Sequence, residues 1–99
     1  REQLSFCSNE TLHSFFIKNR RSTWTYGFDT PSKLGSTAGT YFSEQTVGHL
    51  GFTGTSFWLD LKKNISVTLL TNRAFFPENL TSMKKFRPAF HNAVLKNMV

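Results

Sequence analysis

Cysteine is almost absent from this 99-residue chain, and its scarcity excludes two common ways of stabilising a small domain. Cys7 is the only cysteine, so no intrachain disulfide can form and no zinc site can be built from cysteine pairs. Long apolar runs are also missing, since none approaches the roughly 20 residues that a membrane-spanning helix needs. The first residues, 1–4, are not typical of a signal peptide, and the chain does not begin with methionine. We therefore expect that an upstream segment has been removed.

Acidic residues are few, with six Asp and Glu against twelve Lys and Arg, which gives a formal net charge of +6. Such a surplus can indicate an anionic partner, for example nucleic acid or an acidic membrane surface. Here the basic residues lie in small groups at 18–21, 62–63 and 84–87, separated by apolar stretches, which is more typical of a solvated surface. We expect no nucleic-acid partner, and a basic nucleic-acid-binding module stays open as an alternative.

The remaining composition predicts a single globular domain. A chain of 99 residues is one domain at most, and it can bury a core only if most apolar residues face inward. Hydrophobic residues make up 38% of the chain and aromatic residues 15%, including eleven Phe. This composition is too apolar for a disordered segment, and it favours strands.

A short helix, a strand and a loop are expected in the N-terminal part. Ser8 is a good N-cap residue with apolar residues in helical spacing after it, which predicts a helix over residues 8–17. Aromatic residues alternate with small or polar ones over 24–29, the pattern of a half-buried strand, and Pro31 ends it. Residues 30–39 are mainly Ser, Thr, Gly, Pro and Lys, which predicts an exposed loop that buries nothing.

Three strands and a helix are expected after that loop. Strands are predicted at 46–51, 55–60 and 65–72. The second is apolar on both faces and is therefore expected to be central, and the third is expected to form a hairpin with it. Pro88 fits the first turn of a helix but not its interior, so the last helix either begins near Arg87 or is kinked there. Four apolar residues are expected on one face of this helix: Phe86, Phe90, Val94 and Met98.

Together these elements predict an α+β fold. An antiparallel sheet of three to five strands would carry the N-terminal and C-terminal helices on one of its faces. An exposed edge of such a sheet would allow the chain to associate with itself.

Three glycines interrupt a segment that otherwise has the composition of a strand: Gly48, Gly51 and Gly54. Glycine weakens the interior of a strand, so its presence indicates a bulge or a ligand lying close against the backbone. Residues 48–60 are therefore the first candidate for a binding edge.

Within this segment, His49, Leu50 and Gly51 resemble the third motif of the serine β-lactamase and penicillin-binding superfamily. That motif is usually Lys-Thr-Gly, and the form with histidine is similar to that of class C-like esterases. The resemblance implies a β-lactamase-like α/β sandwich in which residues 1–99 form the C-terminal portion of one domain. It also implies a bacterial origin, with the compartment left open. Other parts similar to this branch are 26–31, 69–73, Arg87-Pro88 and His91.

The resemblance implies a role for each residue of the motif strand. His49 would supply a cation that orients the substrate, and Gly51 would let the substrate lie against the strand. The backbone N–H of Phe52 would be one of two oxyanion donors, the other being the N–H of the serine nucleophile. Leu50 departs from the pattern, because its side chain cannot donate the hydrogen bond that threonine donates. The implied reaction is hydrolysis of a small-molecule ester or amide through an acyl-enzyme, with no metal and no cofactor.

Two other motifs of the superfamily are missing. Ser-x-x-Lys occurs only as Ser82–Lys85, after the third motif instead of long before it, so we interpret it as a chance match and Ser82 as a helix cap. Tyr-x-Asn has no counterpart, and 33–36, which also resembles Lys-Thr-Gly, falls in a predicted loop. His13 and His91 have no partner motif and are interpreted as structural. The chain alone is expected to be inactive, and a non-catalytic penicillin-recognition or interaction module stays open.

Overall fold

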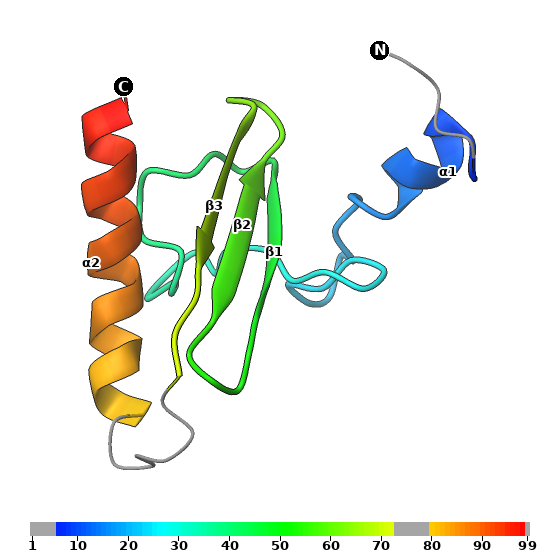
Figure 1. The fold of residues 1–99 in the computed structure, drawn as a ribbon. Coiled ribbons are helices and arrows are strands. Elements are labelled where there is room, and N and C mark those ends of the chain that lie inside the picture. The colour runs from blue at the N-terminus through cyan, green and yellow to red at the C-terminus, as the bar shows by residue number, and fades with distance from the viewer. Residues whose placement is uncertain (1–5, 73–79, 99) are drawn as a thin grey trace.

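The computed structural model describes residues 6–72 and 80–98, which form an open antiparallel sheet with one helix along it and a second helix apart from it (Figure 1). The elements are, in order, α1 (Asn9–Ser14), β1 (Thr46–Leu50), β2 (Ser56–Asp60), β3 (Ile65–Leu69) and α2 (Leu80–Met98). The predicted α+β class is confirmed at this level. Neither helix in the described part of the chain is long and apolar enough to cross a membrane.

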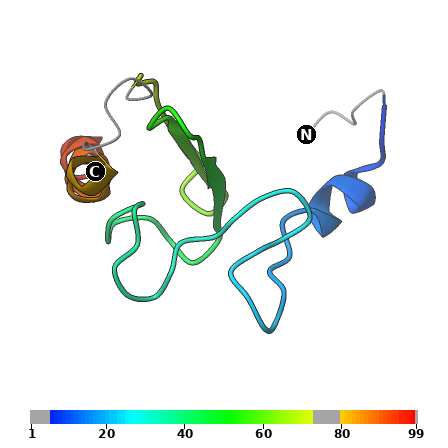
Figure 2. The same cartoon turned by 90° about the horizontal axis from the view of Figure 1, so that it is seen from below.

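The two helices do not share one face of the sheet, and this part of the prediction is wrong. α2 lies along the sheet, whereas α1 lies beyond β1 on the other side of the molecule (Figures 1 and 2). α1 has six residues and buries none of them, so it offers no apolar face for docking. The aromatic residues after it pair locally instead: Phe15 lies 5.8 Å from Tyr26 and Phe16 lies 5.9 Å from Phe28, between ring centres. The predicted N-cap is confirmed, because the Ser8 hydroxyl accepts an N–H of the first turn at 3.1 Å.

The sheet has the order β1-β2-β3 with antiparallel pairs, so β2 is the central strand, as predicted. The predicted hairpin of β2 and β3 is confirmed, and its turn ends at Asn64, whose φ of 58° suits asparagine better than most residues. Trp58 lies opposite Gly48 of β1 and opposite Val67 of β3. Among the described residues the outer edge of β3 pairs with no strand. Self-association through an open edge stays a prediction.

Alternation along the strands gives the sheet two different faces. The Ser56 hydroxyl lies 3.4 Å from Nε2 of His91 in α2. The sheet face that carries the Ser56 side chain is therefore the face that α2 covers. His49 and Phe57, opposite each other in β1 and β2, are exposed on the other face. The covered face contains the buried side chains Thr46, Ser56, Trp58, Asp60, Val67 and Leu69.

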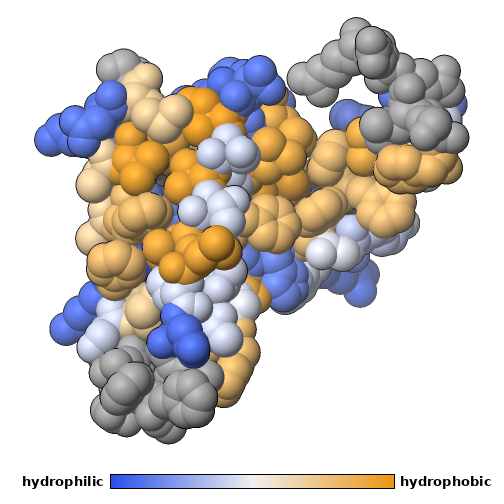
Figure 3. All heavy atoms as spheres, viewed as in Figure 1, coloured by the Kyte–Doolittle hydropathy of each residue, from blue (hydrophilic) through white to orange (hydrophobic). Residues whose placement is uncertain are grey.

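The helix face that packs on the sheet differs by one position from the prediction. The buried row of α2 is Arg87, His91 and Leu95, whereas Phe86 is 47% and Met98 is 57% exposed. Both rows have the four-residue spacing of a helix face, so periodicity alone could not choose between them. Hydropathy favoured the apolar row, but the polar atoms of the buried row find hydrogen-bond partners, which makes their burial possible. Figure 3 shows hydrophobic surface, coloured orange, on the side of the molecule where α2 lies.

α2 also begins earlier than predicted. It starts at Leu80, so the alternative of a start near Arg87 is wrong, and Pro88 lies inside the helix. Ser82 is consequently a residue of the first turn and not the N-cap.

Residues 24–29 form a tight turn instead of the predicted strand. Gly27 has a φ of 84° and reverses the chain, so only Trp24 and Asp29 pair across the turn. Asp29 then meets the outer edge of β1, where it exchanges two backbone hydrogen bonds of 2.7 and 2.8 Å with Gly48. The alternating aromatic residues of this segment therefore contact different neighbours and do not line one face of a strand.

The predicted loop at 30–39 contains no helix or strand, but it is not wholly exposed. Ala38 is 0% and Thr30 is 6% exposed, which corrects the expectation that this segment buries nothing. The loop packs against α2: the carbonyl of Thr37 accepts a hydrogen bond from Nδ1 of His91 at 3.0 Å, and the Thr40 N–H donates to Asn92 at 2.8 Å. Specific backbone contacts, which composition does not reveal, hold it there.

Acidification is expected to destabilise the protein through His91. Burial lowers the pKa of His91 below its ordinary value of 6.5, and the nearby Arg87 charge adds to this, while hydrogen bonds to the carbonyls of Thr37 and Arg87 oppose it. The unfolded chain therefore binds a proton at His91 more readily than the folded chain does. Stability should be full above about pH 6.5 and should fall as the pH drops below that value, by up to about 1.4 kcal/mol per pH unit.

Denaturant titrations between pH 8 and pH 5 measure this effect. His91→Gln should remove most of the slope below pH 6.5, whereas His13→Gln, at an exposed position, should keep it. A slope unchanged in His91→Gln would contradict the assignment.

Candidate functional site

The motif residues lie at the end of β1 and in the turn that leads to β2. His49 and Leu50 are the last two residues of β1, and Gly51 and Phe52 begin the turn. The structure thus places all four predicted site residues along one edge of the molecule, at the end of the sheet where α2 begins (Figure 1). They do not share one face, however. Leu50 lies opposite Ser56 and by alternation belongs to the α2 side, so its half-buried side chain does not lie on the face of His49.

His49 is exposed, and its ring is held by two neighbours. Nδ1 lies 2.6 Å from the carbonyl oxygen of Leu50, and because that oxygen can only accept, the network assigns the proton to Nδ1. The ring of Trp24 lies 5.6 Å away, between centres. This arrangement leaves Nε2 as the atom with which His49 can accept a hydrogen bond when neutral or donate one when protonated.

The glycines of this segment approach the protein's own chain closely. A side chain at Gly48 would overlap the carbonyl oxygen of Phe57 and would lie 2.6 Å from Cε3 of the Trp58 ring. At Gly51, an added Cβ would lie 3.3 Å from Cβ of Thr55. The strand glycine is therefore explained by packing under the central tryptophan, without a ligand.

The turn between β1 and β2 is closed by backbone hydrogen bonds. The Gly54 N–H donates to the Gly51 carbonyl at 3.1 Å, and the Gly51 N–H donates to the Thr55 carbonyl at 2.7 Å. Gly54 has a φ of 93°, a conformation that glycine adopts without strain. Phe52 occupies the first central position of this turn, and its side chain is 73% exposed.

Arg87 is the residue of this site to which sequence analysis gave no role. It lies on α2, is 6% exposed, and its guanidinium reaches the β1–β2 turn. Nε donates to the Gly54 carbonyl at 3.0 Å, and one Nη donates to the carbonyls of Gly51 at 3.1 Å and Thr55 at 3.3 Å. The dipeptide Arg87-Pro88 was one of the parts of the sequence that resemble the β-lactamase-like branch. The only further signal in the sequence is its four-residue spacing from His91 on the helix.

Neither Ser82, interpreted above as a chance match, nor the buried Ser56 lies on the exposed face of His49. Ser56 is within 3.4 Å of the His91 ring, but both are buried between the sheet and α2, where a substrate has no access. Ser82 belongs to α2, which covers the face opposite His49, and the segment 33–36 lies in the loop. The structure brings neither serine to the face of His49.

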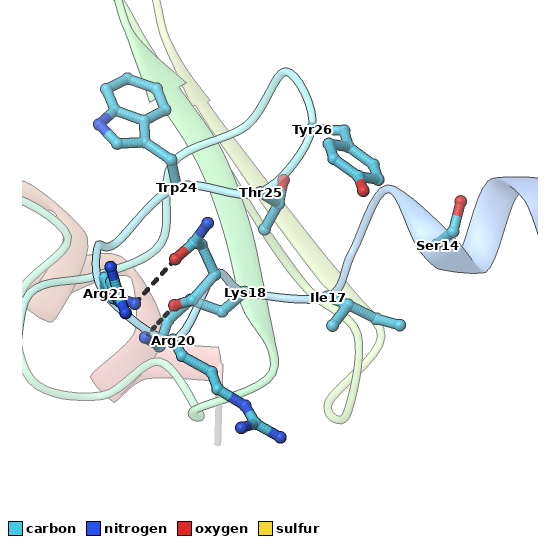
Figure 4. Close-up of a pocket in the computed structure, with 9 residues that line it drawn as sticks. Ser14, Ile17, Lys18, Arg20, Arg21, Trp24, Thr25 and Tyr26 are labelled. Carbon is cyan, nitrogen blue, oxygen red and sulfur yellow. Dashed lines mark hydrogen bonds between the residues drawn. The ribbon is translucent and has the colours of Figure 1, made fainter.

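A cavity of about 620 Å³ adjoins this edge through Trp24, which lines it and also contacts the His49 ring. Its wall comes from one stretch of chain, 14–26, and it is rich in cations and aromatic rings (Figure 4). The Lys18 ammonium donates to two backbone carbonyls at 2.7 and 2.9 Å, and the side chains of Arg20 and Arg21 point in different directions (Figure 4). These cations do not converge on one point.

Comparison with known proteins adds no assignment. No family model matches the chain, no curated protein matches it, and no solved structure matches its fold. The motif and the geometry of the β1–β2 edge are therefore the features that bear on function.

Proposed function

We propose that this chain is the part of a serine hydrolase, of β-lactamase or carboxylesterase type, that forms the substrate-binding strand. One observation carries the proposal: His49 is exposed on the sheet face that α2 leaves uncovered, directly before a tight turn with Phe52 at its first central position. This placement is the one that the Lys-Thr-Gly type of motif needs, because a substrate must reach both the side chain and the turn.

On this proposal the reaction is acyl transfer to a serine hydroxyl and then to water. The serine oxygen attacks the carbonyl carbon of an ester or amide and gives its proton to a base, the carbonyl oxygen becomes an oxyanion, and the leaving group departs with that proton when the carbonyl re-forms. Water then attacks the acyl-serine in the same way, which releases the acid and returns a proton to the serine oxygen. The Phe52 N–H donates to the oxyanion, and His49 holds the substrate or the serine hydroxyl through Nε2. The serine nucleophile belongs to a part of the protein outside these 99 residues.

Two alternatives predict different behaviour. A non-catalytic recognition module would bind a penicillin-like ligand at the same edge without turnover, because its parent protein would lack the serine nucleophile. A basic nucleic-acid-binding module would show steeply salt-dependent binding to single strands. The separated cations around the cavity give less support to the second alternative, since phosphate binding favours converging donors.

Hydrolysis assays are expected to separate these possibilities. The 99-residue chain should not hydrolyse a p-nitrophenyl ester or a chromogenic β-lactam, whereas a longer protein that includes it should. In that protein, His49→Ala should lower kcat/KM by about 100-fold, because it removes a positioned imidazole. His13→Ala, at an exposed position on α1, is the matched control and should have no effect. Turnover by the 99-residue chain that Ser82→Ala abolishes would overturn the proposal.

A further inference from the structure

The Arg87 guanidinium is a buried cation that contacts the carbonyls of one turn. Its hydrogen bonds to Gly51, Gly54 and Thr55 come from two nitrogen atoms and measure 3.0 to 3.3 Å. A planar guanidinium suits this arrangement, since its donors have a fixed fork geometry. A lysine ammonium is a point donor and could not reach the same carbonyls with the same directions. Arg87 therefore acts together with the backbone hydrogen bonds of the turn, which involve the same Gly51 and Thr55 carbonyls, in fixing how its peptide planes are oriented.

The direction of the Gly51–Phe52 peptide follows from this contact. No cis peptide bond occurs in the described chain, so the carbonyl and the N–H of this peptide point in opposite directions. The Gly51 carbonyl points to Arg87, which belongs to the helix covering one face of the sheet. The same carbonyl also accepts the Gly54 N–H across the turn, so the Phe52 N–H points away from both Arg87 and Gly54. His49 is exposed on the sheet face opposite the one that α2 covers.

We propose that Arg87 is a positioning residue that orients and polarises the Gly51–Phe52 peptide, so that the Phe52 N–H is directed at the oxyanion of the substrate. This inference rests on the proposed hydrolase function. The guanidinium withdraws electron density from the Gly51 carbonyl, and hydrogen bonds that share one amide strengthen each other, so the N–H of that amide becomes a better donor. Arg87 itself touches no substrate and acts through the backbone.

Kinetics of the active, longer protein test the inference. Arg87→Lys keeps the charge but loses the fork, and we expect kcat for an ester to fall by about 10- to 100-fold with little change in KM. Complete loss of one oxyanion donor lowers kcat by about 100- to 1000-fold, which sets the upper limit. Lys85→Gln, which removes an exposed cation from the same helix, is the matched control and should leave kcat unchanged.

The ratio of kcat/KM for an ester to that for the matching thionoester identifies the mechanism of the loss. Sulfur accepts hydrogen bonds poorly, so a wild-type oxyanion donor favours the ester, and this preference should shrink by about 10-fold in Arg87→Lys. The ratio does not depend on how much of the variant is folded, so a partly unfolded variant still gives an answer. An unchanged ratio would overturn the role of Arg87 while leaving the hydrolase proposal intact.

The 99-residue chain provides an independent measurement. In ¹⁵N-labelled chain, Arg87→Lys should shift the Phe52 amide resonance and accelerate its hydrogen exchange, whereas Lys85→Gln should do neither. An unperturbed Phe52 amide in Arg87→Lys would show that the arginine does not orient this peptide. If the longer protein hydrolyses no ester or β-lactam, the proposed function fails, and the catalytic role of Arg87 fails with it even if the amide shifts.

Discussion

Replacing Gly48 with alanine is expected to lower the free energy of unfolding by about 3 kcal/mol, the upper part of the range for overpacked cores. The added Cβ would overlap the Phe57 carbonyl oxygen and press on the ring of Trp58. A flexible side-chain tip could move aside, but this carbonyl belongs to the central strand. Trp58 is 1% exposed, so its ring could move only against the groups that surround it. Urea unfolding of the 99-residue chain, followed by tryptophan fluorescence, measures the change.

Gly35→Ala is the matched control for this substitution. Gly35 has a φ of 66°, which disfavours alanine, but an added Cβ would meet nothing within 4 Å. Gly35→Ala should lower the free energy of unfolding by about 1 to 2 kcal/mol, because of the backbone conformation alone. If Gly35→Ala were more destabilising than Gly48→Ala, packing under Trp58 would not be the reason for glycine in β1.

Patterns that depend on local sequence predicted the sheet well. The alternation in 65–72 and the apolar run in 55–60 identified β3 and β2, and the polar residues between them identified the hairpin. The helix cap at Ser8 was predictable because capping requires only a few neighbouring residues. The strands, the hairpin and the helix cap depend only on residues that are close together in the sequence.

Features that depend on distant partners were predicted wrongly. The segment 24–29 has the alternation of a strand, but Gly27 reverses it, and its aromatic residues contact rings on β1, on β2 and in the segment that follows α1. Arg87 and His91 were not expected in the buried row of α2, because their hydrogen-bond partners lie more than 30 residues away in the chain. Hydropathy assigns such residues to solvent when the partner groups are unknown.

The candidate site shows the same division. A three-residue motif was sufficient to single out His49 as a candidate, and the structure places it at the end of β1, next to the β1–β2 turn. Which face of the sheet Leu50 belongs to could not be predicted, because this depends on the register between β1 and β2, and neither strand alone contains that information. The role proposed for Arg87 required the contacts between α2 and the turn.

Replacing Asp60 with asparagine is expected to lower the free energy of unfolding by about 3 kcal/mol at pH 7. The carboxylate is 0% exposed at the end of β2, and four hydrogen bonds converge on it. Ser43 donates through its hydroxyl at 2.6 Å and its N–H at 2.7 Å, and the N–H groups of Lys62 and Lys63 donate at 3.0 and 2.9 Å. An amide offers one oxygen and directs an NH₂ group at one of these donors. Hydrogen bonds to a charged group contribute about 1.5 to 3 kcal/mol each, so losing part of this set is severe.

The pH dependence of the stability difference between wild type and Asp60→Asn shows whether the negative charge of Asp60, and not only the shape of its side chain, stabilises the fold. Burial by itself raises the pKa of Asp60, but the hydrogen bonds from the Ser43 side chain and from the backbone of Ser43, Lys63 and Lys62 outweigh it, so the pKa lies below 3.8. The folded state therefore holds its proton less tightly than the unfolded state. This stabilisation is present above about pH 3.8 and is lost as the pH falls through the lower folded value.

The difference in free energy of unfolding between wild type and Asp60→Asn should accordingly be constant from pH 8 to pH 5 and should become smaller below pH 4. His91 titrates in both proteins, so its contribution cancels in the difference. Glu44→Gln removes one negative charge from an exposed position next to Ser43 and should change stability by less than about 0.5 kcal/mol. A difference that stayed constant down to pH 2.5 would mean that the ionised carboxylate is not what holds the β2–β3 turn to residues 43–45.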